Sequence, residues 1–377
     1  MILSGIRLSN FRNHAATEIA FGPGLNALFG ENGQGKTSIL EAVSYLSLTK
    51  SFYAASDADV VRIGSDGFAL EGTMVAGTGV GHKIRVSYTL TPPEKMFSVD
   101  ASPPETLASV IGRFPAVVLS PENSAITFGG PADRRRFVDL TLAQVSGAYL
   151  RDLMEYRRIL RQRNRILADA RTRGRTAEGL LAPWTENLID CGARIAYRRM
   201  MFIEEFAAYV RQAYLDLQLA GEKPGLTYRC GFPLEGAADA TELSRLFADA
   251  LQRGRAEEAR RGTTLAGPHR DEVRLTLDGL GVQQFASQGQ HKTLLVALKV
   301  AEFAYVKERR EETPLLLLDD VFSELDERRA RRILALAAGM GQAIITTTDD
   351  RTFGTSIAWG GTNRRFSVER GTCRETS

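Results

Sequence analysis

A glycine-rich string, GENGQGKT at residues 30–37, constrains the fold of this chain more than any other feature. It fits the phosphate-binding pattern GxxxxGK followed by Ser or Thr, in which glycines let successive backbone N–H groups turn inward around an anion. Apolar residues at 25–29 read as a strand, and 37–48 read as a helix whose N-terminal end carries partial positive charge toward the phosphates. The combination predicts an α/β nucleotide-binding fold.

Each position of the string has an expected role. Lys36 supplies a positive charge for the outer phosphates of ATP, and the hydroxyl of Thr37 is expected on Mg²⁺. The expected nucleotide-binding residues of this segment are Gly30, Glu31, Asn32, Gly33, Gln34, Gly35, Lys36, Thr37 and Ser38.

A second string, LLLLDD at residues 315–320, reads as a buried strand that ends in two acids. Asp319 is expected to hold Mg²⁺, and Asp320 to orient or deprotonate the attacking water. Both carboxylates can reach one site because the chain leaves the strand after Asp320. Two solvated acids at a strand end are the alternative, which the apolar character of the strand disfavours. The predicted catalytic residues are therefore Lys36, Asp319 and Asp320, and the predicted metal ligands are Thr37 and Asp319.

The chain has 377 residues, which is too long for one ordinary hydrophobic core and predicts two domains or one domain with a large insertion. Long helices are expected over 132–219, with breaks near Gly174 and Pro183, and another helix over 288–309. Further strands are expected over 2–8, 68–75, 82–90, 116–119, 273–277, 315–318 and 343–347.

Composition places the chain among soluble globular proteins, with 44% hydrophobic and 25% charged residues. The three cysteines lack metal-ligand spacing and are expected to be reduced thiols. No apolar run is long enough for a membrane span, and we expect a cytoplasmic protein.

The net charge of +3 is too small to indicate nucleic acid by itself, but the basic residues cluster. Residues 151–175 contain nine arginines and three acids, with an apolar stripe at helical spacing on another face. Arginine suits phosphate oxygens, so Arg157, Arg161 and Arg165 are candidate ligands of nucleic-acid phosphates. A solvated helix face is an equally good interpretation of this tract.

The string SQGQ at residues 287–290 opens the helix that precedes the acidic strand. Ser and Gly at a helix N-terminus form a second phosphate-binding nest, which one γ-phosphate does not need from a single chain. This arrangement is typical of ABC-type ATPases, in which the signature loop of one protomer caps the ATP held by the other. In this chain Ser287, Gln288, Gly289 and Gln290 would form that loop. A simple helix cap is the alternative.

Motifs along nearly the whole chain resemble the RecF family of DNA replication and repair ATPases, which are related to the SMC proteins. The matching strings are SNFRNH (9–14), GENGQGKTSILEA (30–42), SPEN (120–123), DRRRFVDL (133–140), LRQRN (160–164), AGPHRDE (266–272), SQGQHK (287–292) and LLLLDDVFSELD (315–326). Two positions depart from the family: Tyr53 stands where an arginine is usual, and residues 346–349 lack the switch histidine of many ABC proteins.

The resemblance implies an α/β ABC/SMC-type P-loop ATPase head with a mainly helical insertion. Lobe I would comprise 1–130 and 262–377, and lobe II would comprise 131–261. It also implies that Arg12 helps to hold the nucleotide, that 323–326 form a D-loop at a dimer interface, and that His269 and Arg270 serve a structural or communicating role. A buried, hydrogen-bonded imidazole is the expectation for His269.

By the same resemblance, an ATP-dependent homodimer would clamp duplex DNA, near gaps or junctions, as a slow, weakly DNA-stimulated ATPase. RecR, and RecO indirectly, would be its partners in loading recombinase. Two alternatives remain. One is the ATPase subunit of an ABC transporter, against which the arginine-rich insertion counts. The other is a small-molecule P-loop kinase, which would not need Ser287.

Overall fold

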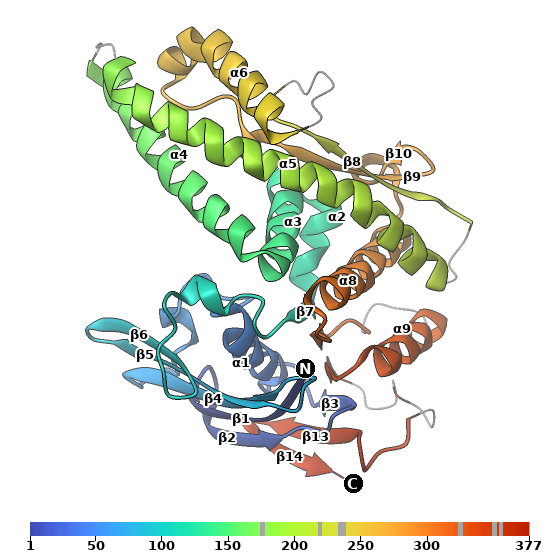
Figure 1. Ribbon diagram of the computed structural model, residues 1–377. Coiled ribbons are helices and arrows are strands. Elements are labelled where there is room, and N and C mark those ends of the chain that lie inside the picture. The colour runs from blue at the N-terminus through green and yellow to red at the C-terminus, as the bar shows by residue number, and fades with distance from the viewer. Residues whose placement is uncertain are drawn as a thin grey trace. The chain divides into compact units, whose positions relative to one another are not determined.

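A computed structural model gives the fold of residues 1–173, 178–217, 221–232, 239–322, 327–348, 353 and 357–376 (Figure 1). The chain divides into two compact units. The first comprises Met1–Ser124, Leu215–Gln218 and Leu295–Ser377, and the second comprises Ala125–Tyr214 and Leu219–Leu294. Among the residues covered, no helix is both long and apolar enough to cross a membrane.

The first unit contains a six-stranded sheet in the order β14-β13-β3-β12-β11-β7. All neighbouring pairs are parallel except β13 and β14, which are antiparallel. The strands are β3 (Leu25–Phe29), β7 (Ala116–Leu119), β11 (Leu315–Asp319), β12 (Ala343–Thr347), β13 (Arg364–Glu369) and β14 (Thr372–Thr376). The apolar runs predicted as buried strands are confirmed in β3, β7, β11 and β12, whereas β13 and β14 were not predicted.

A second, antiparallel sheet in this unit has the order β2-β1-β4-β5-β6. Its strands are β1 (Ile2–Phe11), β2 (His14–Ala20), β4 (Gly67–Val75), β5 (Gly81–Leu90) and β6 (Pro93–Val99). Burial alternates along β4, as expected for a sheet with one face in the core and one in solvent. Short helices η1 (Ala58–Val60) and η2 (Leu107–Val110) lie between strands, η3 (Pro121–Ser124) follows β7, and α9 (Glu327–Met340) precedes β12.

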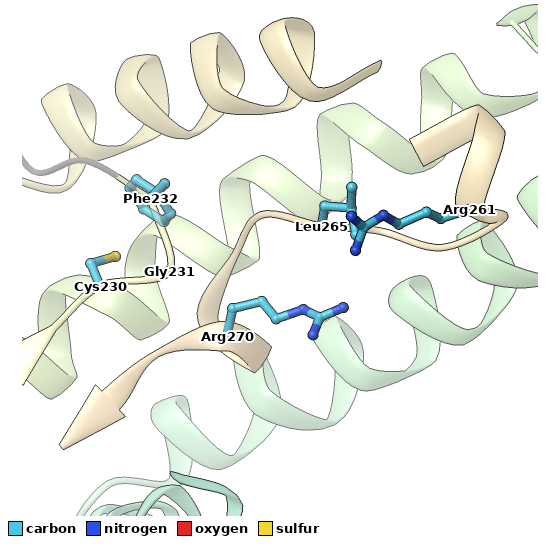
Figure 2. Close-up of a pocket in the computed structure, with 6 residues that line it drawn as sticks. All are labelled: Cys230, Gly231, Phe232, Arg261, Leu265 and Arg270. Carbon is cyan, nitrogen blue, oxygen red and sulfur yellow. The ribbon is translucent and has the colours of Figure 1, made fainter. Parts of the chain in front are cut away.

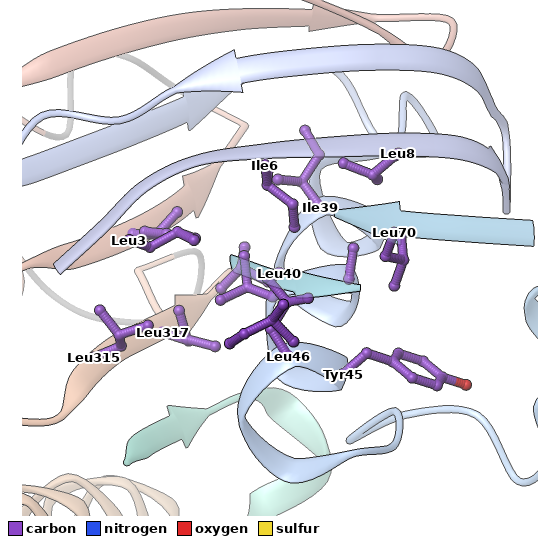
Figure 3. Packing of buried hydrophobic residues seen from close by; sticks show 14 of the residues in the cluster. Leu3, Ile6, Leu8, Ile39, Leu40, Tyr45, Leu46, Leu70, Leu315 and Leu317 are labelled. Atoms are coloured by element: carbon purple, nitrogen blue, oxygen red, sulfur yellow. The ribbon is translucent and has the colours of Figure 1, made fainter. Parts of the chain in front are cut away.

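Helix α1 (Lys36–Leu48) contacts strands of both sheets and lies in the hydrophobic core of this unit. Ile39, Leu40 and Leu46 on this helix are fully buried. Figure 3 shows them among leucines and isoleucines of β1, β4 and β11. Packing on two sides fixes the first turn of α1, and with it the loop that precedes the helix.

The second unit is mainly helical, with a small three-stranded sheet in the order β10-β9-β8. Its helices are α2 (Ala125–Phe128), α3 (Pro131–Val145), α4 (Gly147–Arg173), α5 (Glu178–Asp216), α6 (Ala240–Arg261) and α7 (Val282–Phe285), with η4 (Pro268–Arg270). The strands are β8 (Pro224–Arg229), β9 (Glu272–Leu277) and β10 (Leu280–Gly281), and α8 (Gln288–Arg310) begins in this unit. The predicted lobe limits at 131 and 261 remain a prediction.

The break predicted near Pro183 is wrong, because this proline lies inside α5. Proline removes the hydrogen bond that its N–H would give to the carbonyl four residues earlier, here that of Gly179. Gly179 is exposed in the first turn of the helix, where water can satisfy the carbonyl. The break expected near Gly174 falls outside the residues for which the structure is described.

Candidate nucleotide-binding site

The loop between β3 and α1 has the backbone geometry that its glycines predict. Gly30, Gly33 and Gly35 have φ values of 154°, 78° and 110°, a region that side chains other than glycine rarely adopt. A Cβ atom on Gly30 would lie 2.3 Å from the carbonyl oxygen of Val368, and one on Gly35 would lie 2.6 Å from the side-chain oxygen of Asn13. The loop conformation therefore requires glycine at these positions.

The side chain of Lys36 is hydrogen-bonded to the backbone of this loop. Its Nζ donates to the carbonyl oxygens of Gly30 at 2.6 Å and Glu31 at 2.7 Å. Burial lowers the pKa of the Lys36 ammonium, and the carboxylates of Asp320 and Asp319 oppose that shift. The ammonium is thus held within the loop, where a phosphate site needs positive charge.

Residues from the preceding hairpin support the loop from outside. The Asn13 amide donates to the carbonyl of Gln34 at 2.9 Å, and His14 Nε2 lies 3.0 Å from the carbonyl of Gly35. The backbone N–H groups of Arg370 and Gly371 bond to Gln34 as well. Sequence analysis missed the role of Asn13 and His14, although both lie in the string that resembles the family.

The acidic strand end lies beside the start of α1. Thr37 Oγ1 and Thr346 Oγ1 each donate to Oδ1 of Asp319 at 2.8 Å. β12 pairs with β3 on one side and with β11 on the other, all parallel, so their carboxyl ends meet at one edge of the sheet. Burial raises the pKa of Asp319, and the two hydroxyl donors counteract this shift.

Asp320 lies just beyond β11, with a φ of 47°. Its backbone N–H donates to Thr346 Oγ1 at 2.9 Å. The chain leaves the strand here, as predicted, and both acids lie at the same edge. Thr346 was noted in the sequence only for the absence of a histidine, and the structure places its hydroxyl between the two acids.

A cavity of about 600 Å³ opens over the loop and the strand ends. Its described lining consists of Arg12, Asn13, Asn32, Gly33, Gly35, Lys36, Thr37, Ser38, Asp59, Val61, Arg62, Ile63, Asp320 and Thr346. Oxygen donors of the kind that Mg²⁺ prefers, a hydroxyl and a carboxylate, converge at Thr37 and Asp319. The residues present fit a nucleotide with a bound magnesium ion.

Arg12 lines this cavity and is also paired. Its guanidinium donates twice to Glu41, at 2.8 Å each, and once to the carbonyl of Asp59 at 3.0 Å. Glu41 is buried, and its hydrogen bond raises the pKa of Arg12. The ring of Tyr53, which replaces the arginine usual in the family, lies with its centroid 5.8 Å from the Arg12 guanidinium carbon. Arg12 therefore has a fixed position on the cavity wall.

The SQGQ segment belongs to the second unit and caps α8. The Ser287 N–H donates to the side chain of Gln290 at 2.6 Å, and the Gln290 N–H donates to Ser287 Oγ at 3.3 Å. This reciprocal pair is a capping box. Ser287 and Gln288 are exposed, and Gly289 is half-buried. The expected contact with a second protomer remains a prediction, and residues 323–326 lie outside the described residues.

The arginine tract forms most of α4, and its members have different surroundings. Arg157 donates to the buried Asp139 at 3.1 Å, whereas Arg161 and Arg165 are exposed and have no ion-pair partner within the described ranges. Arg163 is buried against Glu258 at 2.6 Å and serves the packing of α4 on α6. The tract therefore mixes structural arginines with candidate DNA ligands.

A buried polar network joins the helices of the second unit, and the sequence did not reveal it. Arg199 on α5 donates to Asp139 at 2.8 Å and to Asp271 at 2.7 Å, and all three residues are at least 95% buried. Asp139 and Asp271 lie in strings that match the family, so those strings carry structural as well as chemical residues.

His269 is hydrogen-bonded, as expected, and is half-buried. Its Nδ1 lies 2.7 Å from the hydroxyl of Tyr156, and its Nε2 lies 3.2 Å from the carbonyl oxygen of Thr264. Burial lowers the pKa of His269 to about 4. The imidazole is thus neutral near pH 7 and links η4 to α4.

The chain is similar to known proteins over nearly its whole length. The model of the RecF/RecN/SMC N-terminal domain matches residues 2–365. The protein described as "DNA replication and repair protein RecF" from Chloroherpeton thalassium is 39% identical over 94% of this chain and 96% of its own length. Its counterpart from Salinibacter ruber is 41% identical over 92% and 85%.

A solved structure described as the recombination mediator protein RecF-ATP in the RecFOR pathway superposes with a TM-score of 0.91 at 27% identity, covering 100% of this chain and 97% of that one. The family model spans almost the whole chain, and both sequence relatives exceed 30% identity over nearly all of it. The chain therefore belongs to the RecF family of DNA replication and repair proteins, whose ATPase head is related to that of the SMC proteins.

Proposed function

We propose that this protein binds and hydrolyses ATP, and that two ATP-bound copies close on each other to hold duplex DNA. The observation that carries the proposal is the 2.8 Å hydrogen bond to Asp319 from Thr37, which lines a cavity of about 600 Å³. The solved relative with ATP supports this nucleotide as the ligand.

Within this site, the chain positions the phosphates by the inward-facing N–H groups of residues 30–38 and by the Lys36 ammonium. Mg²⁺ held by Thr37 and Asp319 would neutralise charge that develops on the phosphate oxygens. Asp320, displaced from the strand by its positive φ, orients the attacking water. Arg12, anchored by Glu41, adds a second fixed cation on the cavity wall.

Dimerisation follows from the exposed SQGQ segment. Ser287, Gln288, Gly289 and Gln290 would contact the ATP of the second copy, where the helix dipole at the N-terminus of α8 favours a phosphate. Moving such an equilibrium from mostly open to mostly closed needs about 5.5 kcal/mol of differential binding, which two shared nucleotides can supply. Hydrolysis removes the bridging phosphate and opens the dimer, so slow, weakly DNA-stimulated turnover sets how long DNA is held.

The DNA partner is proposed to be duplex DNA near single-strand gaps, contacted by Arg161 and Arg165. RecR, and RecO indirectly, would dock on the dimer during recombinase loading, which is consistent with the RecFOR pathway named for the solved relative. The second unit would be the inserted lobe II of the family. The relatives compared are replication and repair proteins, so nothing in them favours the transporter alternative.

Molecular mass in solution tests the proposal, with ATP and Mg²⁺ and with or without duplex DNA. We expect a dimer in the wild type, loss of the dimer in Lys36→Ala and Ser287→Arg, and a dimer trapped on DNA in Asp320→Asn. A monomer under every condition would overturn the clamp. ATPase activity retained in Ser287→Arg would instead favour a single-chain P-loop enzyme such as a small-molecule kinase.

A further inference from the structure

The second unit contains a cavity that shares no residue with the nucleotide site. It has a volume of about 610 Å³ and is lined by Cys230, Gly231, Phe232, Arg261, Leu265 and Arg270. Figure 2 shows the guanidinium groups of Arg261 and Arg270 extending into the same space from two different segments. Neither arginine was assigned a ligand by the sequence or by the proposed function.

The wall that carries Arg270 is built by close backbone approach. A Cβ atom on Gly231 would lie 2.4 Å from the carbonyl oxygen of Gly267 and 2.8 Å from Cβ of Arg270. The Gly231 N–H donates to the buried carboxylate of Asp271 at 2.7 Å, and the Arg270 N–H donates to Gly267 at 2.8 Å. The base of the Arg270 side chain therefore has a fixed place although its guanidinium is exposed.

The charges around the cavity leave a surplus of guanidinium groups. Arg261 and its neighbour Arg260 share one carboxylate, that of Glu257, at 2.5 Å each. Arg171 donates to the backbone carbonyl of Arg261 at 3.0 Å, which brings another cation to this end of α6. Arg270 has no acidic partner in the ranges that the structure covers. The cavity is therefore suited to an anion.

The remaining lining, as far as the structure describes it, is uncharged. Phe232 is buried and stacks on Phe247 with centroids 4.8 Å apart, and Leu265 lies beside Arg261 in Figure 2. Burial raises the pKa of the Cys230 thiol, which stays neutral near pH 7 and does not repel an anion. An apolar wall beside two guanidinium groups fits a phosphate attached to an organic group.

We propose that this cavity is a phosphate-binding site, in which Arg261 and Arg270 hold the phosphate oxygens while Leu265 faces the group that carries the phosphate. One planar guanidinium already matches both oxygens of a carboxylate. Two guanidinium groups from different segments match the three-dimensional set of oxygens on phosphate. The phosphate can belong to a nucleic-acid backbone or to a free small molecule, and these two sources share the same chemistry.

The test has two arms, each with the full chain. In the first, inorganic phosphate is titrated at constant ionic strength into protein that carries Lys36→Ala, so that the nucleotide loop contributes little. Adding Arg270→Gln or Arg261→Gln should weaken phosphate binding at least tenfold, and Arg270→Lys should weaken it less. Arg245→Gln, an exposed arginine of α6 paired with Asp249, is the matched control and should change nothing.

In the second arm, duplex DNA binding is measured against salt with an intact Lys36. A backbone phosphate in the cavity predicts that each Gln variant lowers the magnitude of the log–log salt slope by about 0.9. An unchanged slope with weakened phosphate binding assigns the site to a free phosphate compound. The second arm rests on the proposed DNA binding and the first does not, so the two proposals fail separately.

Unchanged phosphate affinity in both Gln variants would overturn the phosphate site. So would tighter binding of a hexaglutamate peptide than of phosphate, because the cavity would then recognise an acidic protein segment. With Lys36 intact, both Gln variants should hydrolyse ATP without DNA at the wild-type rate. Their unfolding temperatures should also equal that of the protein without the Gln substitution, since Arg270 is exposed and Arg261 is replaced at the end of a helix.

Discussion

The hydroxyl of Thr37 donates a 2.8 Å hydrogen bond to Asp319, although the two residues are 282 positions apart in the chain. The parallel order β3-β12-β11 creates this contact, because it brings the end of the loop strand and the end of the acidic strand to one edge of the sheet. The strand between them, β12, contributes Thr346, which bonds to the same carboxylate oxygen. The three groups form one hydrogen-bonded unit.

Replacing Thr346 with valine should impair hydrolysis more than nucleotide binding. The change removes a donor to Asp319 and leaves the N–H of Asp320 without its acceptor, at a cost of about 1–3 kcal/mol in stability. We expect the rate of ATP hydrolysis to fall roughly tenfold or more, as typically follows the loss of orientation of a catalytic group. Steady-state hydrolysis and ATP titration measure the two effects. Thr346→Ser keeps the hydroxyl and should retain most of the activity; equal loss in both variants would contradict the role of the hydroxyl.

The contribution of Arg12 to ATP binding should depend on the planar, forked shape of its guanidinium and not only on its charge. Arg12 uses three different nitrogens to bond both carboxylate oxygens of Glu41 and the Asp59 carbonyl, and the single nitrogen of lysine cannot occupy these three places, so Arg12→Lys should weaken ATP binding several-fold. Arg7→Lys provides the control, since Arg7 forms an exposed ion pair with Glu18. An ATP titration of the three proteins that gives one common affinity would show that Arg12 serves the fold alone.

The sequence allowed the central strands and the two halves of the site to be predicted, because both depend on local patterns. β3, β7 and β12 follow the apolar runs residue for residue. Thr37 and Asp319 were predicted to lie together because a phosphate loop and an acidic strand end both supply ligands to the same Mg²⁺. By contrast, β13 and β14 are short and mostly polar: β13 has only two buried apolar residues, Phe366 and Val368, and β14 has none.

Contacts between distant segments account for the rest. The support of the loop by Asn13 and His14 arises only when β1 and β2 pair and turn toward residue 35. Arg199 lies at helical spacing among buried apolar residues such as Ile195 and Phe202, but its partners are 60 and 72 positions away, so the local sequence does not show what it pairs with. Arg157 was selected as a DNA ligand from its helical face, and its pairing with Asp139 depends on how α3 meets α4.

Arg199→Met should strongly destabilise the second unit. The change leaves the buried carboxylates of Asp139 and Asp271 without their shared cation, and breaking a buried pair costs about 3–5 kcal/mol. Arg194→Met on the same helix removes a partly exposed pair with Asp152 and should cost less than about 1 kcal/mol. Denaturant unfolding of both variants checks the difference. Similar midpoints for the two variants would mean that water enters the network and replaces Arg199.

The three candidate DNA ligands on α4 should not be equivalent. Arg161→Gln and Arg165→Gln should each lower the magnitude of the salt slope of duplex DNA affinity by about 0.9, because each removes one phosphate contact. Arg157→Gln should lower it less, since Asp139 already neutralises this arginine. Arg158→Gln is the control, because Arg158 is paired with Glu155. Affinity that does not respond to Arg161→Gln and Arg165→Gln would remove this face of α4 from the DNA site.

His269 should make stability fall in acid. Its pKa is about 4 in the folded chain, below the ordinary value of 6.5, because burial disfavours the charged imidazole and Arg270, Arg135 and Arg163 add to the effect. The unfolded chain therefore binds a proton between pH 6.5 and about pH 4 where the folded chain does not, so this contribution is complete above pH 6.5 and is lost as the pH falls. The loss amounts to about 3 kcal/mol by pH 4.

Denaturant unfolding at a series of pH values, with wild type and His269→Gln, measures this contribution. The variant loses the hydrogen bonds to Tyr156 and Thr264, so it should be less stable at pH 7, and its stability should fall less steeply toward pH 4. The two curves should therefore approach each other as the pH falls. Parallel curves would mean that His269 titrates alike in the folded and unfolded chains, and the imidazole would then have to be accessible to solvent in the folded protein.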